Sequence, residues 1–396
     1  MGLKPRPLDG VTVVSLEHAV AAPFCTRQLA DMGARVIKIE RPGVGDFARG
    51  YDTRVKGLAS HFVWINRGKE SVTLDLKHPD AQAVLHQLLA QADVLVQNLA
   101  PGAAARMGLS FEALHPSLPR LVVCDISGYG NHGPYRDKKA YDLLIQSEAG
   151  YLSVTGTPDE PVKSGNSIAD IAAGMYAYSN ILSALLLRER TGVGEHIDVS
   201  MLEALGEWMG YPMYYAYEGA APPPRAGASH ATIYPYGPFA VGDGGTVMLG
   251  LQNEREWQRF CQSVLLQPEL ADDDRFANNS ARSANREALE AMIVQTFAAC
   301  TTAEVQQRLD NAQIANARVN DMQGLWQHPQ LAARQHWHEV PSPVGPIRAP
   351  LPPGRHSGFD YRMDGIPALG ADTDRVLQSL GLSPERIATM RAANAV

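Results

Sequence analysis

The sequence predicts an α/β protein whose main domain is built around a parallel sheet. Three observations predict this class. Short apolar strands alternate with amphipathic helices in the N-terminal third, glycine and proline separate these segments, and 45% of the 396 residues are hydrophobic while 19% are charged. A chain of this length can bury the cores of two domains, and its composition excludes a disordered or fibrous protein.

The first strand–helix–strand unit covers residues 11–40. VTVVSL (11–16) has the alternation of a strand, PFCTRQLADMG (23–33) that of a short helix closed by Gly33, and ARVIKIE (34–40) that of a second strand. Such a unit is right-handed when its strands are parallel.

The alternation continues to residue 127. A strand is expected at 71–76, a helix at 80–92, and further strands at 93–99 and 121–127. Together with the first unit, these segments predict a parallel sheet of the kind found in nucleotide-binding domains.

A glycine-rich stretch follows the last of these strands. GYGNHG (128–133) matches the GxGxxG pattern of dinucleotide-binding proteins. In that motif the third glycine opens a helix, whereas here Pro134 and a polar loop follow directly. We therefore expect a surface loop, which could still face a ligand, and no dinucleotide site.

Proline-rich stretches mark the domain boundaries. Residues 218–230 and 339–358 have the composition of linkers, and 235–251 predicts a β-hairpin that turns near Asp243. The expected organisation is a large domain over 1–217, a smaller α+β domain over 226–328, and a return segment over 329–396 that completes the large domain.

Composition also restricts the compartment and the partners. No apolar run approaches the roughly 20 residues that span a bilayer, and the N-terminus lacks the apolar core of a signal peptide. The cysteines show no CxxC spacing and the histidines no HExxH spacing, so we expect reduced thiols and no metal. A net charge of −7 argues against nucleic acid. The prediction is a cytoplasmic protein that acts on small molecules and not on a membrane.

One carboxylate stands out. SGNSIADIAAGMYAYSNILSALLLRER (164–190) predicts a long helix with Asp170 near its start, between small and apolar residues. Asp170 could cap the helix, because an aspartate oxygen accepts the free N–H groups of a first turn. It could also be a nucleophile sheltered from water. The local pattern leaves both interpretations open.

Six segments decide the family that the chain resembles. Taken in order, they are LADMGARVIKIERPGVGDFAR, NRGKESVTLDLKHPDA, ADVLVQNLAPGAAARMGL, SGYGNHGPYRDKKAYD, SIADIAAG and RTGVGEHIDVSMLEA. With these segments the chain resembles, over nearly its whole length, the family III CoA-transferases of the CaiB/BaiF type. That family contains formyl-CoA transferase, carnitine CoA-transferase and the α-methylacyl-CoA racemases.

The resemblance implies a fold and a mechanism. The fold is a large Rossmann-like domain built from both chain ends and a smaller middle domain, with two subunits interlocked as a homodimer. The implied catalytic residue is Asp170, which attacks an acyl-CoA thioester and forms an anhydride. The small residues around it would let a bulky thioester approach; they are Ala169, Ala172, Ala173 and Gly174.

The resemblance also implies the residues that contact CoA, which is a substrate and not a tightly bound cofactor. Cations at matching positions would bind its phosphates; they are Arg41, Lys77, Arg106 and Lys139. The alternative for each is a solvated surface charge. Tyr141 matches a tyrosine near the active site, and its alternative is core packing beside Leu143 and Leu144.

Two departures from the family pattern concern the substrate. Val20 occupies the position of a glutamine in formyl-CoA transferase, so backbone N–H groups or another side chain must hold the reacting carbonyl. The glycine loop of formyl-CoA transferase is missing as well. Its replacement contains Gly227, Ser229 and His230, which could cover the site or recognise a carboxylate, although a lone histidine more often packs or faces solvent.

The expected reaction moves CoA from an acyl-CoA, with succinyl-CoA as donor, to a C4–C5 dicarboxylate such as itaconate or mesaconate. Arg49, Arg54 or Arg225 could bind the distal carboxylate. The alternative is an α-methylacyl-CoA racemase, but Ala140–Tyr141–Asp142 replaces the family's histidine-containing motif, and a tyrosine with a pKa near 10 is a poor base. A non-catalytic CoA-binding protein would be expected to have lost Asp170 or the cations.

Overall fold

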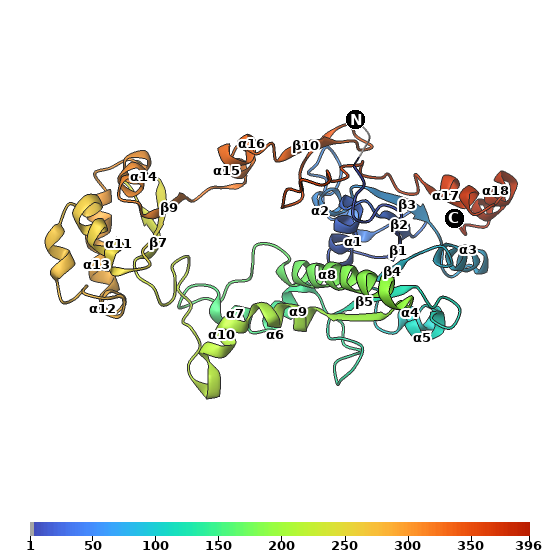
Figure 1. The fold of residues 1–396 in the computed structure, drawn as a ribbon, viewed down its shortest axis with the longest axis horizontal. Helices are drawn as coiled ribbons and strands as arrows, with labels where there is room; N and C mark the ends of the chain where they lie inside the picture. The colour runs from blue at the N-terminus through green and yellow to red at the C-terminus, as the bar shows by residue number, and fades with distance from the viewer. Residues whose placement is uncertain (1–3) are drawn as a thin grey trace. The chain divides into compact units, whose positions relative to one another are not determined.

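The computed structural model describes residues 4–396, which divide into two compact units (Figure 1). Unit 1 consists of Met1–Gly150, Ser164–Met209 and Gln330–Val396. Unit 2 consists of Tyr151–Lys163 and Gly210–Pro329.

The centre of unit 1 is a six-stranded parallel sheet with the order β3-β2-β1-β4-β5-β6. Its strands are β1 (Thr12–Leu16), β2 (Arg35–Glu40), β3 (Lys69–Thr73), β4 (Val94–Gln97), β5 (Val122–Ser127) and β6 (His196–Ser200). Val13 of β1 pairs with Val36 on one side and Val94 on the other, and all three are fully buried. The predicted parallel sheet is confirmed. Its strand order changes direction between β1 and β4, where such sheets bind ligands outside the carboxyl ends of their strands.

Helices and a C-terminal segment complete unit 1. The helical elements are α1 (Ala21–Asp31), η1 (Phe47–Gly50), α2 (Ser60–Ile65), α3 (Pro79–Leu89), α4 (Ala103–Arg106), α5 (Phe111–Leu114), α6 (Asp142–Glu148), α8 (Ile168–Thr191), α9 (Met201–Trp208), α17 (Thr373–Ser379) and α18 (Pro384–Ala392). Figure 1 shows α17 and α18 in red at the end of the chain. The residues that flank them bond to β3 and to the segment just after it: Ser71 N–H donates to Asp372, and Asp75 N–H donates to the carbonyl of Ala395.

A separate antiparallel hairpin also belongs to unit 1. It consists of β10 (Trp337–Val340) and β11 (Ile347–Pro350), in which Val340 pairs with Ile347. Buried apolar side chains of the hairpin pack with Phe62 of α2. Pro329–Ala333 forms α16 at the boundary between the two units.

Unit 2 contains the antiparallel sheet β7-β8-β9 and its own core. The strands are β7 (Tyr236–Ala240), β8 (Thr246–Gly250) and β9 (Ala315–Arg318), so the predicted hairpin near Asp243 is confirmed. The helical elements are α7 (Tyr151–Val154), α10 (Gly210–Tyr215), η2 (Tyr217–Gly219), α11 (Glu254–Arg259), η3 (Phe260–Leu265), η4 (Pro268–Asp272), α12 (Asn279–Ala284), α13 (Arg286–Phe297), α14 (Thr302–Asn311) and α15 (Met322–Trp326). Residues 151–163 belong to this unit because Arg225 donates to the carbonyls of Thr157 and Pro158, both at 2.8 Å.

The longest helix, α8, is long and apolar enough by length and composition to cross a membrane, unlike the expectation that no apolar segment approaches that length. The core helix of a globular protein meets the same criterion. Here α8 contacts α1, α6, α9, β5 and β6, and its first turn carries Asp170. The buried apolar residues of α8 therefore pack inside unit 1.

Candidate active site

A pocket of about 1200 Å³ opens at the carboxyl ends of the parallel strands of unit 1. Residues at the ends of three strands line it, namely Leu16, Glu40 and Ser127, together with Asn98, which directly follows β4. This is the place where the strand order changes direction between β1 and β4, so the sheet topology itself forms the pocket.

Asp170 lines this pocket from the first turn of α8. It is the third residue of the helix, whose N-cap is Ser167, so Asp170 is not the capping residue. The N–H groups of Ala169 and Asp170 instead donate to Oδ1 of Asp142, at 2.8 and 3.2 Å. Within residues 4–396, no side chain or backbone group is hydrogen-bonded to the Asp170 carboxylate. The helix-cap interpretation is therefore wrong, and the carboxylate is free to contact a ligand.

The surroundings of Asp170 disfavour its charge. Burial, and second the negative charge of Asp142, raise the pKa of the Asp170 carboxyl to about 7. Poorly hydrated carboxylates whose pKa lies near 7 are typical of catalytic sites.

The small residues that flank Asp170 do not face the pocket. Ala169, Ala172 and Ala173 have no exposed surface, and a Cβ on Gly174 would lie 3.0 Å from the ring of Phe24. The expectation that these residues make room for a thioester is wrong. Their small size instead lets α8 pack closely on α1.

Aromatic rings form one wall of the pocket. His18 stacks on Phe47 with ring centres 5.0 Å apart, and Tyr51 contacts Phe47 and His61 at 6.1 and 5.4 Å. Tyr141 also lines the pocket and is 72% exposed, which excludes the core-packing alternative. No sequence pattern predicted that His18, Phe47, Tyr51 and His61 would line the pocket. The position of His18 just after the first strand was a usable signal, because the carboxyl ends of parallel strands meet at one edge.

Three of the four expected phosphate-binding cations line the same pocket: Arg41, Lys77 and Lys139. The fourth, Arg106, is exposed at the end of α4 and is not among the described residues that line it. Its guanidinium lies beside the start of its own helix, since a Cβ on Gly102 would lie 2.9 Å from Nη1 of Arg106.

The three arginines considered for a distal carboxylate are not among the pocket residues described for unit 1. Arg49 is paired with both oxygens of Glu40 at 2.8 Å and lies over the ring of Phe62. Arg54 is exposed, and Arg225 is bound to backbone carbonyls within unit 2. The other lysine in the pocket, Lys138, is ion-paired with Glu148.

A buried charge network supports the loop that follows β1. Lys38 Nζ lies 3.2 Å from Glu17 and 2.8 Å from Asp46, and Lys69 Nζ lies 2.7 Å from Glu17. Asp46 Oδ1 in turn accepts from the N–H of Ala19, whose φ of 60° is left-handed. Burial opposes the charge of Glu17, but Lys38 and Lys69 outweigh it and lower the pKa of Glu17 to about 2. These ions hold the loop in a conformation that a non-glycine residue rarely adopts.

The substrate-loop candidates lie in both units. Val20 lines the pocket as the N-cap of α1, and its side chain makes no capping hydrogen bond. Gly227, Ser229 and His230 belong to unit 2. His230 accepts from two nearby backbone N–H groups through Nδ1 and stacks on Tyr236. In unit 2, His230 therefore has the packing role that was its alternative.

The glycine-rich stretch 128–133 is a loop after β5, as predicted, and Gly128 lines the pocket. A Cβ on Gly128 would lie 2.2 Å from the Cβ of Ala140. Glycine is thus required here because two backbone segments of the pocket wall approach closely.

Comparison with known proteins assigns the family. The family model "CoA-transferase family III" matches residues 8–373. The chain is 36% identical to acetyl-CoA:oxalate CoA-transferase of Acetobacter aceti, covering 92% of this chain and 94% of that protein. It is 31% identical to human succinyl-CoA:glutarate CoA-transferase, covering 95% and 86%. A CaiB/BaiF family protein from Brucella suis has a matching crystal structure, with 33% identity, a TM-score of 0.86, and 95% and 100% of the chains covered.

The chain belongs to CoA-transferase family III. It is an acyl-CoA:carboxylate CoA-transferase with the CaiB/BaiF fold, and CoA thioesters are its substrates. In the part of this family III enzyme that the structure describes, no group of three or more His, Cys, Asp or Glu side chains could hold a metal ion.

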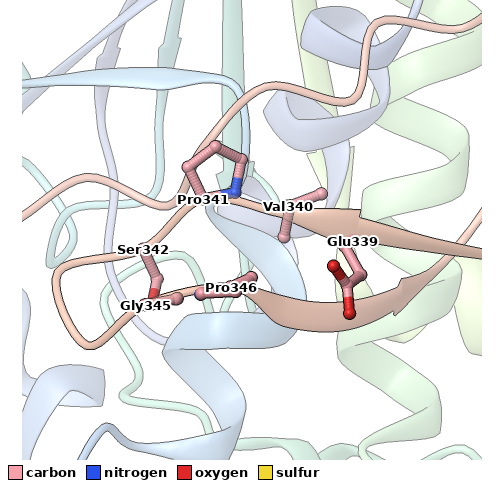
Figure 2. A pocket seen from close by; sticks show the side chains of 6 residues that line it. All are labelled: Glu339, Val340, Pro341, Ser342, Gly345 and Pro346. Atoms are coloured by element: carbon pink, nitrogen blue, oxygen red, sulfur yellow. The ribbon is translucent and has the colours of Figure 1, made fainter.

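The family III enzyme has a second, smaller hollow on its β10–β11 hairpin (Figure 2). The hollow has a volume of about 350 Å³ and is lined by Glu339, Val340, Pro341, Ser342, Gly345 and Pro346. The hydroxyl of Ser342 donates to the carbonyl of Gly345 inside the turn. Among the residues that line this hollow, only Glu339 is charged, and none is a cation that could bind phosphate. The larger pocket, which contains Asp170 and several cations, is therefore the candidate active site.

Proposed function

We propose that this enzyme transfers CoA from succinyl-CoA to a C4–C5 dicarboxylic acid, such as itaconate or mesaconate, with Asp170 as the nucleophile. The observation that carries the proposal is the Asp170 carboxylate, which has no hydrogen bond from residues 4–396 and faces a pocket of about 1200 Å³. Arg41, Lys77 and Lys139 line that pocket and suit the phosphates of CoA.

The proposed reaction is an exchange in covalent steps. The Asp170 carboxylate attacks the thioester carbonyl and the carbon–sulfur bond breaks. CoA leaves as a thiolate, and an acyl-aspartyl anhydride is formed. The thiolate then attacks the Asp170 carbonyl, which releases the donor acid and leaves an aspartyl-CoA thioester. The acceptor carboxylate attacks that thioester, which releases CoA thiolate and forms a second anhydride. The thiolate then attacks the acyl carbonyl of the acceptor, which releases the new acyl-CoA and the Asp170 carboxylate. No proton donor is needed for a thiolate or carboxylate leaving group.

The carbonyl that is attacked needs hydrogen-bond donors, because negative charge develops on its oxygen. Val20 replaces the glutamine of formyl-CoA transferase and has no donor in its side chain. We assign this role to backbone N–H groups at the start of α1. Ala21 lines the pocket there, and the first N–H groups of a helix have no partner within the helix.

The choice of a dicarboxylate acceptor rests on the relatives, whose names specify glutarate and oxalate. The arginines expected for the distal carboxylate are engaged elsewhere or exposed, so they do not support the choice.

The test is incubation of the purified enzyme with succinyl-CoA and a panel of acids, followed by mass spectrometry of the thioesters. The panel contains itaconate, mesaconate, malate, glutarate, formate, oxalate and carnitine. With the wild-type enzyme we expect a new thioester between CoA and a dicarboxylic acid. With Asp170→Ala the rate of its formation should fall by roughly 10³-fold or more. Acceptance of monocarboxylates alone would overturn the acceptor class. Exchange of the α-proton of a 2-methylacyl-CoA with solvent deuterium, without any CoA transfer, would establish the racemase alternative.

We also propose that the enzyme is a cytoplasmic homodimer of interlocked chains. Large apolar side chains are exposed on α8 and α9, with Leu186 67% and Trp208 46% exposed, and would be covered by a second chain. All four cysteines are free and buried, which suits a reducing compartment. Light scattering should give twice the mass of the 42.9 kDa chain, and a monomer would contradict the dimer.

A further inference from the structure

The first turn of α8 is held by a residue from another helix. A helix usually begins with a residue whose own side chain accepts its free N–H groups. In α8 the N-cap Ser167 makes no such bond. Asp142, the first residue of α6, supplies the acceptor instead, with Oδ1 at 2.8 Å from the N atom of Ala169 and 3.2 Å from that of Asp170.

Asp142 is itself fixed by a buried amide. Its second oxygen, Oδ2, accepts from Gln146 Nε2 at 2.6 Å, and Gln146 is only 1% exposed. The other end of that amide, Oε1, accepts from the N–H of Ser164 at 2.9 Å, just before α8. Both Asp142 oxygens are thus committed, and the Asp142–Gln146 pair joins α6 to the segment that leads into α8.

We propose that Asp142 is a positioning residue of the transferase, which takes over the capping of α8 and thereby leaves the Asp170 carboxylate to the substrate. The inference rests on the proposed function of Asp170. Aspartate in a first turn is prone to bind the free N–H groups beside it. Because Asp142 already occupies two of these groups, Asp170 is not drawn into the cap and stays directed to the pocket.

The same residue places a negative charge beside the nucleophile. Burial is the larger reason why the pKa of Asp170 is raised, and Asp142 is the second. The other charged or titratable groups that line this pocket are His18, Glu40, Arg41, Tyr51, His61, Asp75, Lys77, Lys138, Lys139 and Tyr141. Substitution of Asp142 by asparagine removes the charge and keeps one oxygen acceptor for the cap, while its NH2 group replaces the oxygen that accepts from Gln146.

The test compares Asp142→Asn, Asp142→Ala and the control Asp137→Asn. Asp137 is an exposed carboxylate in the loop before α6, paired only with the neighbouring Arg136 among the described residues. The first readout is the pH midpoint at which a water-soluble carbodiimide, which reacts with protonated carboxyls, labels Asp170, measured by peptide mass spectrometry. The second is the pH dependence of kcat/KM for CoA transfer from succinyl-CoA.

In Asp142→Asn we expect both midpoints to move about one pH unit lower, with the plateau kcat within about threefold of wild type. In Asp142→Ala the cap is lost as well, and the plateau kcat should fall on the order of 10²-fold while KM for succinyl-CoA stays within about threefold. Asp137→Asn should match wild type in every readout.

The proposal is overturned if Asp142→Asn leaves the labelling midpoint of Asp170 unchanged, or if a folded Asp142→Ala variant keeps the wild-type kcat. If Asp142→Ala does not fold, the labelling midpoint in Asp142→Asn still tests whether Asp142 acts on Asp170, because this variant keeps an acceptor for the cap. The labelling midpoint requires no turnover. A shifted midpoint in an enzyme that transfers CoA to no acid would therefore refute the proposed function while upholding the effect of Asp142 on Asp170.

Discussion

A Cβ atom placed on Gly174 of α8 would lie 2.7 Å from the carbonyl oxygen of Ala21 in the first turn of α1. This distance is shorter than real Cβ contacts, and its partner is backbone that cannot rotate away. Both helices supply residues to the pocket, Asp170 from α8 and Val20 and Ala21 from the start of α1. The close contact at Gly174 therefore sets the distance between Asp170, the proposed nucleophile, and the N–H groups proposed to hold the carbonyl.

Replacement of Gly174 by alanine should separate the two helices. We expect a loss of about 1–3 kcal/mol in the free energy of unfolding, because the added methyl overpacks the contact. The kcat for CoA transfer should fall as well, since Asp170 lies one turn away. Urea denaturation and steady-state kinetics measure both effects.

Gly206 provides the matched control, since it also lies within a helix and a Cβ there meets no atom within 4 Å. Gly206→Ala should be neutral or stabilise by about 0.5–1 kcal/mol. Equal stability of both variants would show that the α1–α8 contact tolerates a methyl group.

The raised pKa of Asp170 predicts that the ionised carboxylate destabilises the fold. The folded state holds its proton up to a pH of about 7, whereas the unfolded chain releases it near its ordinary value of 3.8. Stability should therefore fall as the pH rises between these values. Asp170→Asn removes this loss and should be more stable than wild type by about 2–4 kcal/mol at pH 8, but not at pH 4.

Urea denaturation at both pH values measures the difference. Asp137→Asn, which removes an exposed carboxylate, should show no such change with pH. A constant difference between Asp170→Asn and wild type at pH 4 and pH 8 would mean that the Asp170 pKa is not raised.

The buried network under the loop after β1 predicts a large cost for the removal of one ion. Lys38 is fully buried between Glu17 and Asp46, so Lys38→Met leaves two carboxylates without their shared partner. We expect a loss of about 3–5 kcal/mol in the free energy of unfolding. Arg255→Met, an exposed change on α11, should stay within about 0.5 kcal/mol of wild type. A loss below about 1 kcal/mol for Lys38→Met would show that the ions are not coupled as the structure has them.

The positions of the cations predict which of them bind CoA. Lys77 lines the pocket and Arg106 does not, in the part of the chain described. Lys77→Ala should raise KM for succinyl-CoA about 10-fold with little change in kcat, because a lost phosphate contact weakens ground and transition states alike. Arg106→Ala should change KM by less than about threefold. A larger increase in KM for Arg106→Ala than for Lys77→Ala would mean that the phosphates of CoA bind near α4.

Much of the fold was predictable from local pattern. The strand expected at 11–16 is β1 (Thr12–Leu16), the helix expected at 23–33 is α1 (Ala21–Asp31), and the hairpin expected within 235–251 is β7–β8. Apolar alternation and turn residues determine such elements because they act over a few neighbouring residues. The observed ends of these elements differ by one or two residues from the predicted ends, because the sequence does not show how each end is capped.

The site was less predictable. Asp170, Arg41 and Tyr141 were found from motifs and do line the pocket. The aromatic wall around Phe47 was missed, because it is assembled from segments that carry no shared motif. Ala172 was given a role toward substrate, although it is completely buried.

The sequence by itself determined the parallel sheet and the CoA-transferase family, and it predicted Asp170 as the catalytic residue, because periodicity and motif spacing are properties of short segments. Only the tertiary structure decided that Asp142 caps α8, that Gly174 packs on α1, and that Arg49 belongs to Glu40. Asp142 and Ala169 are 27 positions apart, and Gly174 contacts a helix that begins about 150 positions earlier. Whether a small residue faces a ligand or a neighbouring helix, and whether a carboxylate is a cap or a nucleophile, depends on these distant partners.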